Sequence, residues 1–116
     1  MTRERQTLGK TGEDLAAAAL ERRGYAILAR RYRTRHGEID IVAQDADTLV
    51  FVEVKARMRG ECGSAAEAVT RHKQRRLGSM AADYLARHDL SDVACRFDVV
   101  AIDGEVLTVI RDAFCL

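Results

Sequence analysis

The sequence predicts an α/β domain of the element order αβββαββ, with a central mixed sheet of about five strands flanked by helices. Two segments show helical periodicity, about residues 6–23 and 64–88, and five short segments are rich in β-branched residues. Tight turns join two pairs of these strands, which predicts hairpins within the sheet. Strands that are interrupted by a long helix are typical of a layered α/β architecture.

Length and composition limit the possible protein classes. A chain of 116 residues predicts one domain over residues 1–116, and a net charge of +1 means that any nucleic-acid surface must come from clustered charges. Three cysteines without C-x-x-C spacing argue against a disulfide framework or a zinc ribbon. The polar first residues and the lack of an apolar run near the roughly 20 residues of a membrane span predict a cytoplasmic protein without a membrane segment.

Each predicted element has its own signals. The first helix is expected from about Gln6 to Arg23 and ends at Gly24, with an apolar face of Leu8, Leu15, Ala16, Ala19 and Leu20. A short strand, Tyr25–Leu28, should follow, and then a polar segment, Arg30–Arg35.

For the second helix, Ser64 and Glu67 form an expected capping box, and the helix should run to about His88. Its expected apolar positions are Ala65, Ala68, Val69, Leu77, Met80, Ala81, Tyr84 and Leu85. The last hairpin should comprise Arg96–Ile102, a turn at Asp103-Gly104, and Glu105–Ile110.

The middle hairpin carries the candidate site. It comprises the strands Glu38–Ala43 and Leu49–Lys55. If Ala46 and Asp47 form a two-residue turn, Asp45 pairs with Thr48, and Asp40 falls opposite Glu53. A slip of one residue would send Asp40 to the other face of the sheet. Alternation should place Phe51, Glu53 and Lys55 on one face and Val52 and Val54 on the other. It should also place Glu38, Asp40 and Val42 opposite Ile39 and Ile41.

Two neighbouring carboxylates repel each other, and a divalent cation resolves this repulsion. Mg²⁺ prefers carboxylate oxygen and keeps waters that can act as nucleophiles, and Mn²⁺ should be able to substitute for it. We therefore expect Asp40, Glu53 and the Val54 carbonyl to be metal ligands, with Lys55 holding a water and stabilising a phosphate. The alternative is an amphipathic hairpin whose Glu53 and Lys55 form only surface pairs. The apolar run before Glu53 favours a central strand and hence the site.

The same residues carry a family resemblance. Asp40 followed by Glu53-Val54-Lys55 resembles the PD-(D/E)xK motif of nucleases, with Ile39 at the often degenerate proline. Nearly the whole chain resembles the YraN family of small bacterial proteins, which is similar to archaeal Holliday-junction resolvases and to the restriction-endonuclease-like fold. The segments that carry the resemblance are Gly9–Glu13, Gly37–Ala43, Leu49–Arg57, Arg96–Val100 and Ala113-Phe114.

The resemblance implies a metal bound by Asp40 and Glu53, with Lys55 at the reacting water. It also implies that Glu13 on the first helix completes the site, and that the protein forms a homodimer as junction resolvases do. Glu13 has an ordinary alternative role, because the helix dipole favours an acid near the start of a helix.

Other polar residues have simpler interpretations. Asp98, within an apolar strand, is expected to be mainly a structural acid. The sequence Gly9-Lys10-Thr11 is not a P-loop, because Glu4 stands where the first glycine is required. His36 and His72 have no companion ligand spacing.

Two groups of basic residues, one around Tyr32 and one early in the second helix, predict phosphate contacts beside the site, although such runs are usually solvated faces. The expected nucleic-acid contacts are Arg30, Arg31, Arg33, Arg35, Arg57, Lys73 and Arg76. The functional hypothesis is a Mg²⁺-dependent endonuclease that acts on DNA, branched or single-stranded. The alternatives are a non-catalytic nucleic-acid-binding module and a subunit of a DNA-processing assembly.

Overall fold

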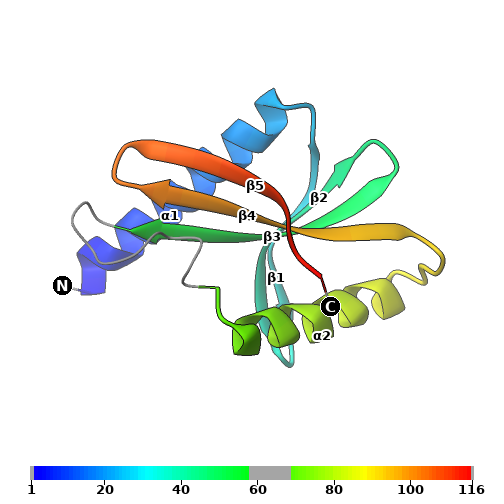
Figure 1. Cartoon of the computed structure of the whole chain (residues 1–116). Helices are drawn as coiled ribbons and strands as arrows, with labels where there is room; N and C mark the ends of the chain where they lie inside the picture. Colours follow the sequence, from blue (N-terminus) through cyan, green and yellow to red (C-terminus); the bar gives the residue numbers. More distant parts are fainter. Residues whose placement is uncertain (1, 58–68, 116) are drawn as a thin grey trace.

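In the computed structural model, all five strands form one mixed sheet (Figure 1). The structure describes residues 2–57 and 69–115, with side chains from Thr11 onward. The strand order is β1-β2-β3-β4-β5, in which β3 and β4 are parallel and the other neighbours are antiparallel. The predicted order αβββαββ is confirmed, and this arrangement is consistent with a restriction-endonuclease-like fold. The elements are α1 (Thr2–Arg22), β1 (Ala26–Thr34), β2 (Gly37–Asp45), β3 (Thr48–Arg57), α2 (Arg71–Arg87), β4 (Ala94–Asp103) and β5 (Val106–Phe114).

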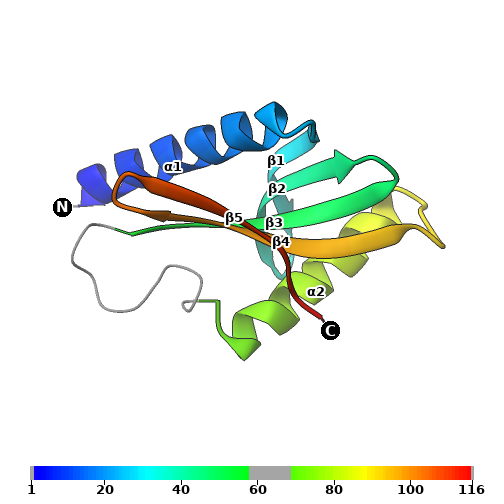
Figure 2. The same cartoon turned by 45° about the horizontal axis from the view of Figure 1, so that its top comes forward.

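The two helices cover opposite faces of the sheet (Figure 2). Beneath α1, the buried side chains are Ala16, Ala17, Leu20, Tyr25, Ile41, Ala43, Val50, Val52, Val100 and Ile102. Beneath α2, they are Ile39, Val42, Leu49, Phe51, Val69, Leu77, Met80, Ala81, Tyr84 and Val99. Strand β3 contributes to both clusters and lies in the middle of the sheet. Burial on both faces explains the continuous apolar run Leu49–Val52.

The first helix and strand differ in detail from the prediction. Helix α1 begins at Thr2, earlier than expected, and ends as predicted beside Gly24, whose φ of +94° is readily adopted by glycine. Leu15 was assigned to the apolar face but is 50% exposed. The first strand is longer than predicted, because β1 continues through most of the polar segment to Thr34 by backbone pairing with β2.

The second helix begins later than its periodicity suggested. Thr70 is its N-cap, and the Thr70 hydroxyl accepts a hydrogen bond of 3.2 Å from the backbone N–H of Lys73. The prediction that Val69 belongs to the second helix is therefore wrong. The expected capping box of Ser64 and Glu67 lies outside the described residues. The helix ends at Arg87, close to the predicted end.

The last hairpin turns one residue later than predicted. Asp103 pairs with Val106, so Gly104 and Glu105 form the two-residue loop, and Gly104 adopts a φ of +63°. The strand β5 also extends further than expected, to Phe114, whose ring stacks on Phe97 at a centroid distance of 4.9 Å. In the described part of the chain, no helix is long and apolar enough to cross a membrane.

Candidate active site

The register of the middle hairpin agrees with the prediction. Asp45 pairs with Thr48, and the pairing continues to Ile41 opposite Val52. One residue further along this register, Asp40 reaches Glu53. The ladder between β2 and β3 ends here, and the backbone N–H of Val54 donates a hydrogen bond of 2.8 Å to Oδ2 of Asp40. The Asp40 carboxylate thus replaces a backbone acceptor of β2 at the point where the two strands part.

The orientation of Asp40 comes from an irregularity that the sequence did not reveal. Ile39 and Val42 pack in the cluster beneath α2, whereas Ile41 packs beneath α1. The expected alternation, with Ile39 and Ile41 on one face, is therefore wrong. Arg31, at the corresponding point of β1, has a φ of +53° and is missing from the regular pairing. Asp40 is missing from the β1–β2 pairing at the same point, and its carboxylate binds the Val54 N–H of β3.

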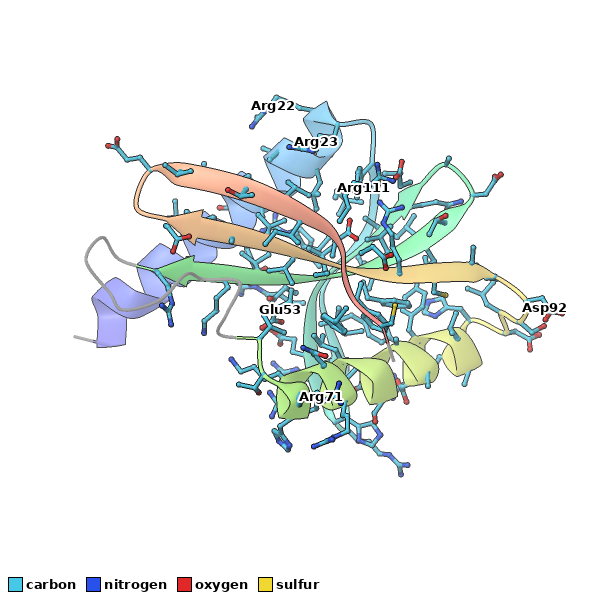
Figure 3. The ribbon with its side chains drawn as sticks, viewed as in Figure 1. Arg22, Arg23, Glu53, Arg71, Asp92 and Arg111 are labelled. Carbon is cyan, nitrogen blue, oxygen red and sulfur yellow. The ribbon has the colours of Figure 1, made fainter. Side chains whose placement is uncertain are left out.

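Glu53 and Lys55 lie on the face of β3 that is covered by α2, as predicted. Phe51, two residues before Glu53, contacts Tyr84 of α2 with a centroid distance of 5.7 Å. Val52 and Val54 face the other way and pack beneath α1. Figure 3 shows Glu53 between β3 and the first turns of α2, near the end that carries Arg71.

The carboxyl groups of Asp40 and Glu53 lie close enough for each to act on the pKa of the other. Burial, reinforced by the negative charge of Glu53, raises the pKa of Asp40 to about 7 from an ordinary value of 3.8. The Val54 N–H opposes this rise because it stabilises the carboxylate. Burial also raises the pKa of Glu53, although the cations of Lys73, Lys55 and Arg76 counteract this effect. Near pH 7, Asp40 is therefore partly protonated.

Three basic side chains face this acidic pair. Lys55 comes from β3, and Lys73 and Arg76 come from the first two turns of α2. Burial, followed by the charge of Lys73, lowers the pKa of Lys55. Arg76 passes over Gly37 at the start of β2, where a Cβ would lie 3.7 Å from the Arg76 Nε. Gly37 has a φ of +133°, a backbone conformation that glycine adopts readily and other residues rarely do.

Glu13 approaches the pair from α1. The neighbouring Gly12 allows close contact, because a Cβ there would lie 3.3 Å from the Cβ of Ala56 on β3. The negative charge of Glu13 contributes to the raised pKa of Asp40. The Glu13 carboxylate also accepts a hydrogen bond of 3.2 Å from Nε of Arg31. Glu13 therefore lies near the site, held by Arg31.

The donor set can be tested against a hard divalent cation. Two half-buried carboxyl groups, of which Asp40 is partly protonated near pH 7, form a group in which a cation can replace a proton. Both polar groups of a strand residue point toward the same neighbouring strand, so the Val54 carbonyl, like its N–H, faces β2 and Asp40. Among the described residues, no group of three or more His, Cys, Asp or Glu is placed to hold a metal ion. Asp40, Glu53 and the Val54 carbonyl could hold Mg²⁺ together with water, and this ligand set stays a prediction.

The remaining basic candidates divide into two groups. On β1, Arg30 pairs with Asp14 at 2.7 Å, Arg31 pairs with Glu13, and Arg33 pairs with Glu38 at 3.2 Å. Arg35 is exposed, and Arg57 is half-buried at the end of β3. Exposed ion pairs contribute at most about 1 kcal/mol, so these arginines can exchange a carboxylate for a phosphate. Their contact with nucleic acid stays a prediction.

Asp98 belongs to a separate polar network on the α1 side of the sheet. It is fully buried and accepts hydrogen bonds from Tyr25 Oη (2.8 Å), Arg96 Nε (3.0 Å) and the backbone N–H of Asp112 (2.9 Å). Arg96 also donates to Asp45 at 2.8 Å. These contacts confirm the interpretation of Asp98 as a structural acid.

The chain was compared with known protein families. Residues 12–102 match the model of the uncharacterised protein family UPF0102. This chain belongs to the UPF0102 family. UPF0102 proteins of Ralstonia nicotianae and Geobacter sulfurreducens are 51% and 54% identical to it, over 91% and 82% of this chain and 85% and 74% of their own lengths. A UPF0102 protein of Desulforapulum autotrophicum is 48% identical over 98% of both chains.

The family match confirms the resemblance seen in the sequence, and it includes the whole candidate site from Glu13 to Arg76. The site in this UPF0102 chain contains one arrangement that the sequence analysis missed. Lys73 was expected only to contact nucleic acid, and it also lies close enough to Lys55 and Glu53 for its charge to lower both of their pKa values. The sequence could have predicted this position of Lys73, because Lys73 precedes the buried Leu77 by four residues and so lies on the same face of the helix.

Proposed function

We propose that this UPF0102 protein is a Mg²⁺-dependent endonuclease that hydrolyses phosphodiester bonds of DNA. The observation that carries the proposal is the contact between Asp40 and Glu53 at the end of the β2–β3 ladder, directly beneath three basic side chains. A buried carboxyl pair is costly for a protein to keep, and such perturbed acids concentrate at functional sites. Here the pair adjoins Lys55, a cation able to contact a phosphate.

Each residue of the site has a chemical role in the proposal. Asp40 and Glu53, with the Val54 carbonyl, hold the metal ion. The bound Mg²⁺ supplies Lewis acidity toward a phosphate oxygen and toward water. Lys55 donates hydrogen bonds to the attacking water and to a non-bridging phosphate oxygen, where negative charge grows during the reaction. Arg31 holds Glu13 at the margin of the site, where its charge adds to the field on Asp40.

Cleavage assays test this function directly. Linear, flapped, single-stranded and four-way DNA are incubated with wild type and Lys55→Ala in Mg²⁺ or Mn²⁺. We expect metal-dependent cleavage by wild type of at least one substrate and a loss of about 10²-fold or more in Lys55→Ala. Arg75→Gln, an exposed change on α2, serves as the matched control. Activity that survives Lys55→Ala undiminished would refute the assignment.

The second candidate is a nucleic-acid-binding module that does not cleave. The three cations that surround Glu53 favour it as much as they favour a nuclease, since phosphate contacts need only positive charge. The two candidates differ at the carboxyl pair. A module has no need of a metal, so it would give equal heats with Mg²⁺ in wild type and Asp40→Asn.

A further inference from the structure

Lys73 occupies an unusual position for a basic residue of a surface helix. It precedes Leu77 by four residues and Met80 by seven, and both of these side chains are buried against the sheet. Lys73 is accordingly half-buried, whereas Arg71 and Arg75 on the other side of the helix are exposed. The N-cap at Thr70 fixes the start of the helix, because its hydroxyl accepts from the Lys73 N–H at 3.2 Å. Lys73 is therefore directed toward the sheet.

Lys55 meets Lys73 from the opposite side. It lies on the same face of β3 as Phe51, whose ring contacts Tyr84 of α2. Lys55 lies near enough to Lys73 for the charge of Lys73 to lower the pKa of Lys55, although the two lysines come from different elements. Two amino groups at this separation repel each other when both are charged, and an anion between them removes the repulsion.

The nearby acids do not neutralise this basic group. Lys55, Lys73 and Arg76 supply three positive charges around Glu53. Asp40 and Glu53 supply at most two negative charges, and the third acid near the site, Glu13, is paired with Arg31. Positive charge therefore exceeds negative charge around Glu53, and a bound divalent cation would increase the excess. An anion is the ligand that such a place attracts.

We propose that Lys55 and Lys73 together form a phosphate-binding site that holds a phosphodiester group of nucleic acid beside the Asp40–Glu53 pair. The non-bridging oxygens of a phosphodiester accept hydrogen bonds from two separate ammonium groups, and lysine binds phosphate as a compact point charge. Arg76, held over Gly37, adds positive charge at the rim of the same site. This inference rests on the proposed function, which it deepens by assigning Lys73 to the substrate.

The first test uses inorganic pyrophosphate and the full chain in EDTA, with the lysine ε-methylene signals followed by NMR. We expect the signals of Lys55 and Lys73 to move together and to saturate. Lys73→Gln should weaken pyrophosphate binding about tenfold or more, Lys73→Arg should retain most of it, and Arg75→Gln should leave it unchanged. Shifts that do not saturate, or equal losses in Lys73→Gln and Arg75→Gln, would overturn the site. Unchanged far-UV circular dichroism of Lys73→Gln excludes misfolding as the cause.

The second test distinguishes nucleic acid from a free phosphate compound. Binding of a labelled DNA duplex is measured in EDTA at several salt concentrations. Lys73→Gln should lower the slope of log K against log [salt] by about 0.9, the value for one lost phosphate contact. An unchanged slope combined with lost pyrophosphate binding would assign the site to a free phosphate compound and refute the phosphodiester. Neither test contains metal, so Mg²⁺ titration of Lys73→Gln, which retains both carboxyl groups, examines the proposed metal site separately.

Discussion

Replacing Asp40 by asparagine should make the protein more stable at alkaline pH. Asparagine resembles the protonated form of Asp40, because its carbonyl oxygen still accepts from the Val54 N–H and its amide group donates to Glu53. In wild type, the folded state raises the pKa of Asp40, so protonated Asp40 is favoured in the folded protein. The resulting stabilisation is fully present below the ordinary pKa of 3.8 and is lost as the pH rises to about 7. The asparagine variant has no such loss.

The size of the effect follows from the pKa. A rise from 3.8 to about 7 corresponds to about 4 kcal/mol against ionised Asp40 in the folded state. Water reaches this half-buried group and relieves part of the cost, so we expect Asp40→Asn to gain about 2 to 4 kcal/mol over wild type between pH 4 and pH 8. For a domain of this size, this gain corresponds to a difference in Tm on the order of 10 °C at pH 8.

The assay is thermal and urea unfolding of both proteins from pH 4 to pH 9 in EDTA. Asp47→Asn, an exposed change in the turn of the same hairpin, removes a carboxylate of equal charge and serves as the control. We expect the Asp47→Asn curve to run parallel to wild type. If the Asp40→Asn curve also ran parallel to wild type, Asp40 would not be the buried acid described here.

Three further predictions concern residues around the site. Lys73→Gln removes the like charge beside Lys55, so the pKa of Lys55 should rise toward its ordinary value of 10.5. NMR titration of the Lys55 ε-methylene signal measures this pKa, and an unchanged value would contradict the proximity of the two lysines. Gly37→Ala forces a side chain into a φ of +133° near Met80 and Arg76, so Tm should fall by several degrees, corresponding to about 1 kcal/mol or more; an unaltered Tm would show that this turn relaxes freely. Asp98→Ala leaves Arg96 and the Tyr25 hydroxyl without their buried acceptor, so urea unfolding should show that the free energy of unfolding falls by about 3 to 5 kcal/mol. The protein that remains folded should still bind Mg²⁺.

The sequence predicted the pairing at the site better than it predicted side-chain directions. The two-residue turn at Ala46-Asp47 sets the register, and the register brings Asp40 to Glu53. Strict alternation then failed at Asp40, where β2 lies opposite the left-handed Arg31 of β1 and both residues are missing from the regular pairing. No glycine marks that position, so local sequence gave no sign of the irregularity.

The helix α2 illustrates a second limit. Its helical period correctly predicts that Leu77, Met80 and Tyr84 are buried. The same period predicts that Lys73, one turn earlier, lies on the face of the helix that is turned to the sheet. The apparent capping box of Ser64 and Glu67 drew attention to an earlier start, whereas Thr70 is the N-cap of the described helix. Charge alone grouped Lys73 with the exposed Arg71 and Arg75. The distinction between them depends on tertiary packing against β3.

The central claim is that Asp40 and Glu53 form one site for a divalent cation, in which the metal displaces the proton that Asp40 carries near pH 7. Calorimetric titration with Mg²⁺ and Mn²⁺ near pH 7, repeated in buffers of different ionisation enthalpy, measures both binding and proton release. We predict saturable binding by wild type with release of a fraction of a proton that falls toward zero as the pH rises above 8, and no binding by Asp40→Asn. Equal heats for the two proteins, or binding without any release of protons at pH 6 to 7, would contradict the account.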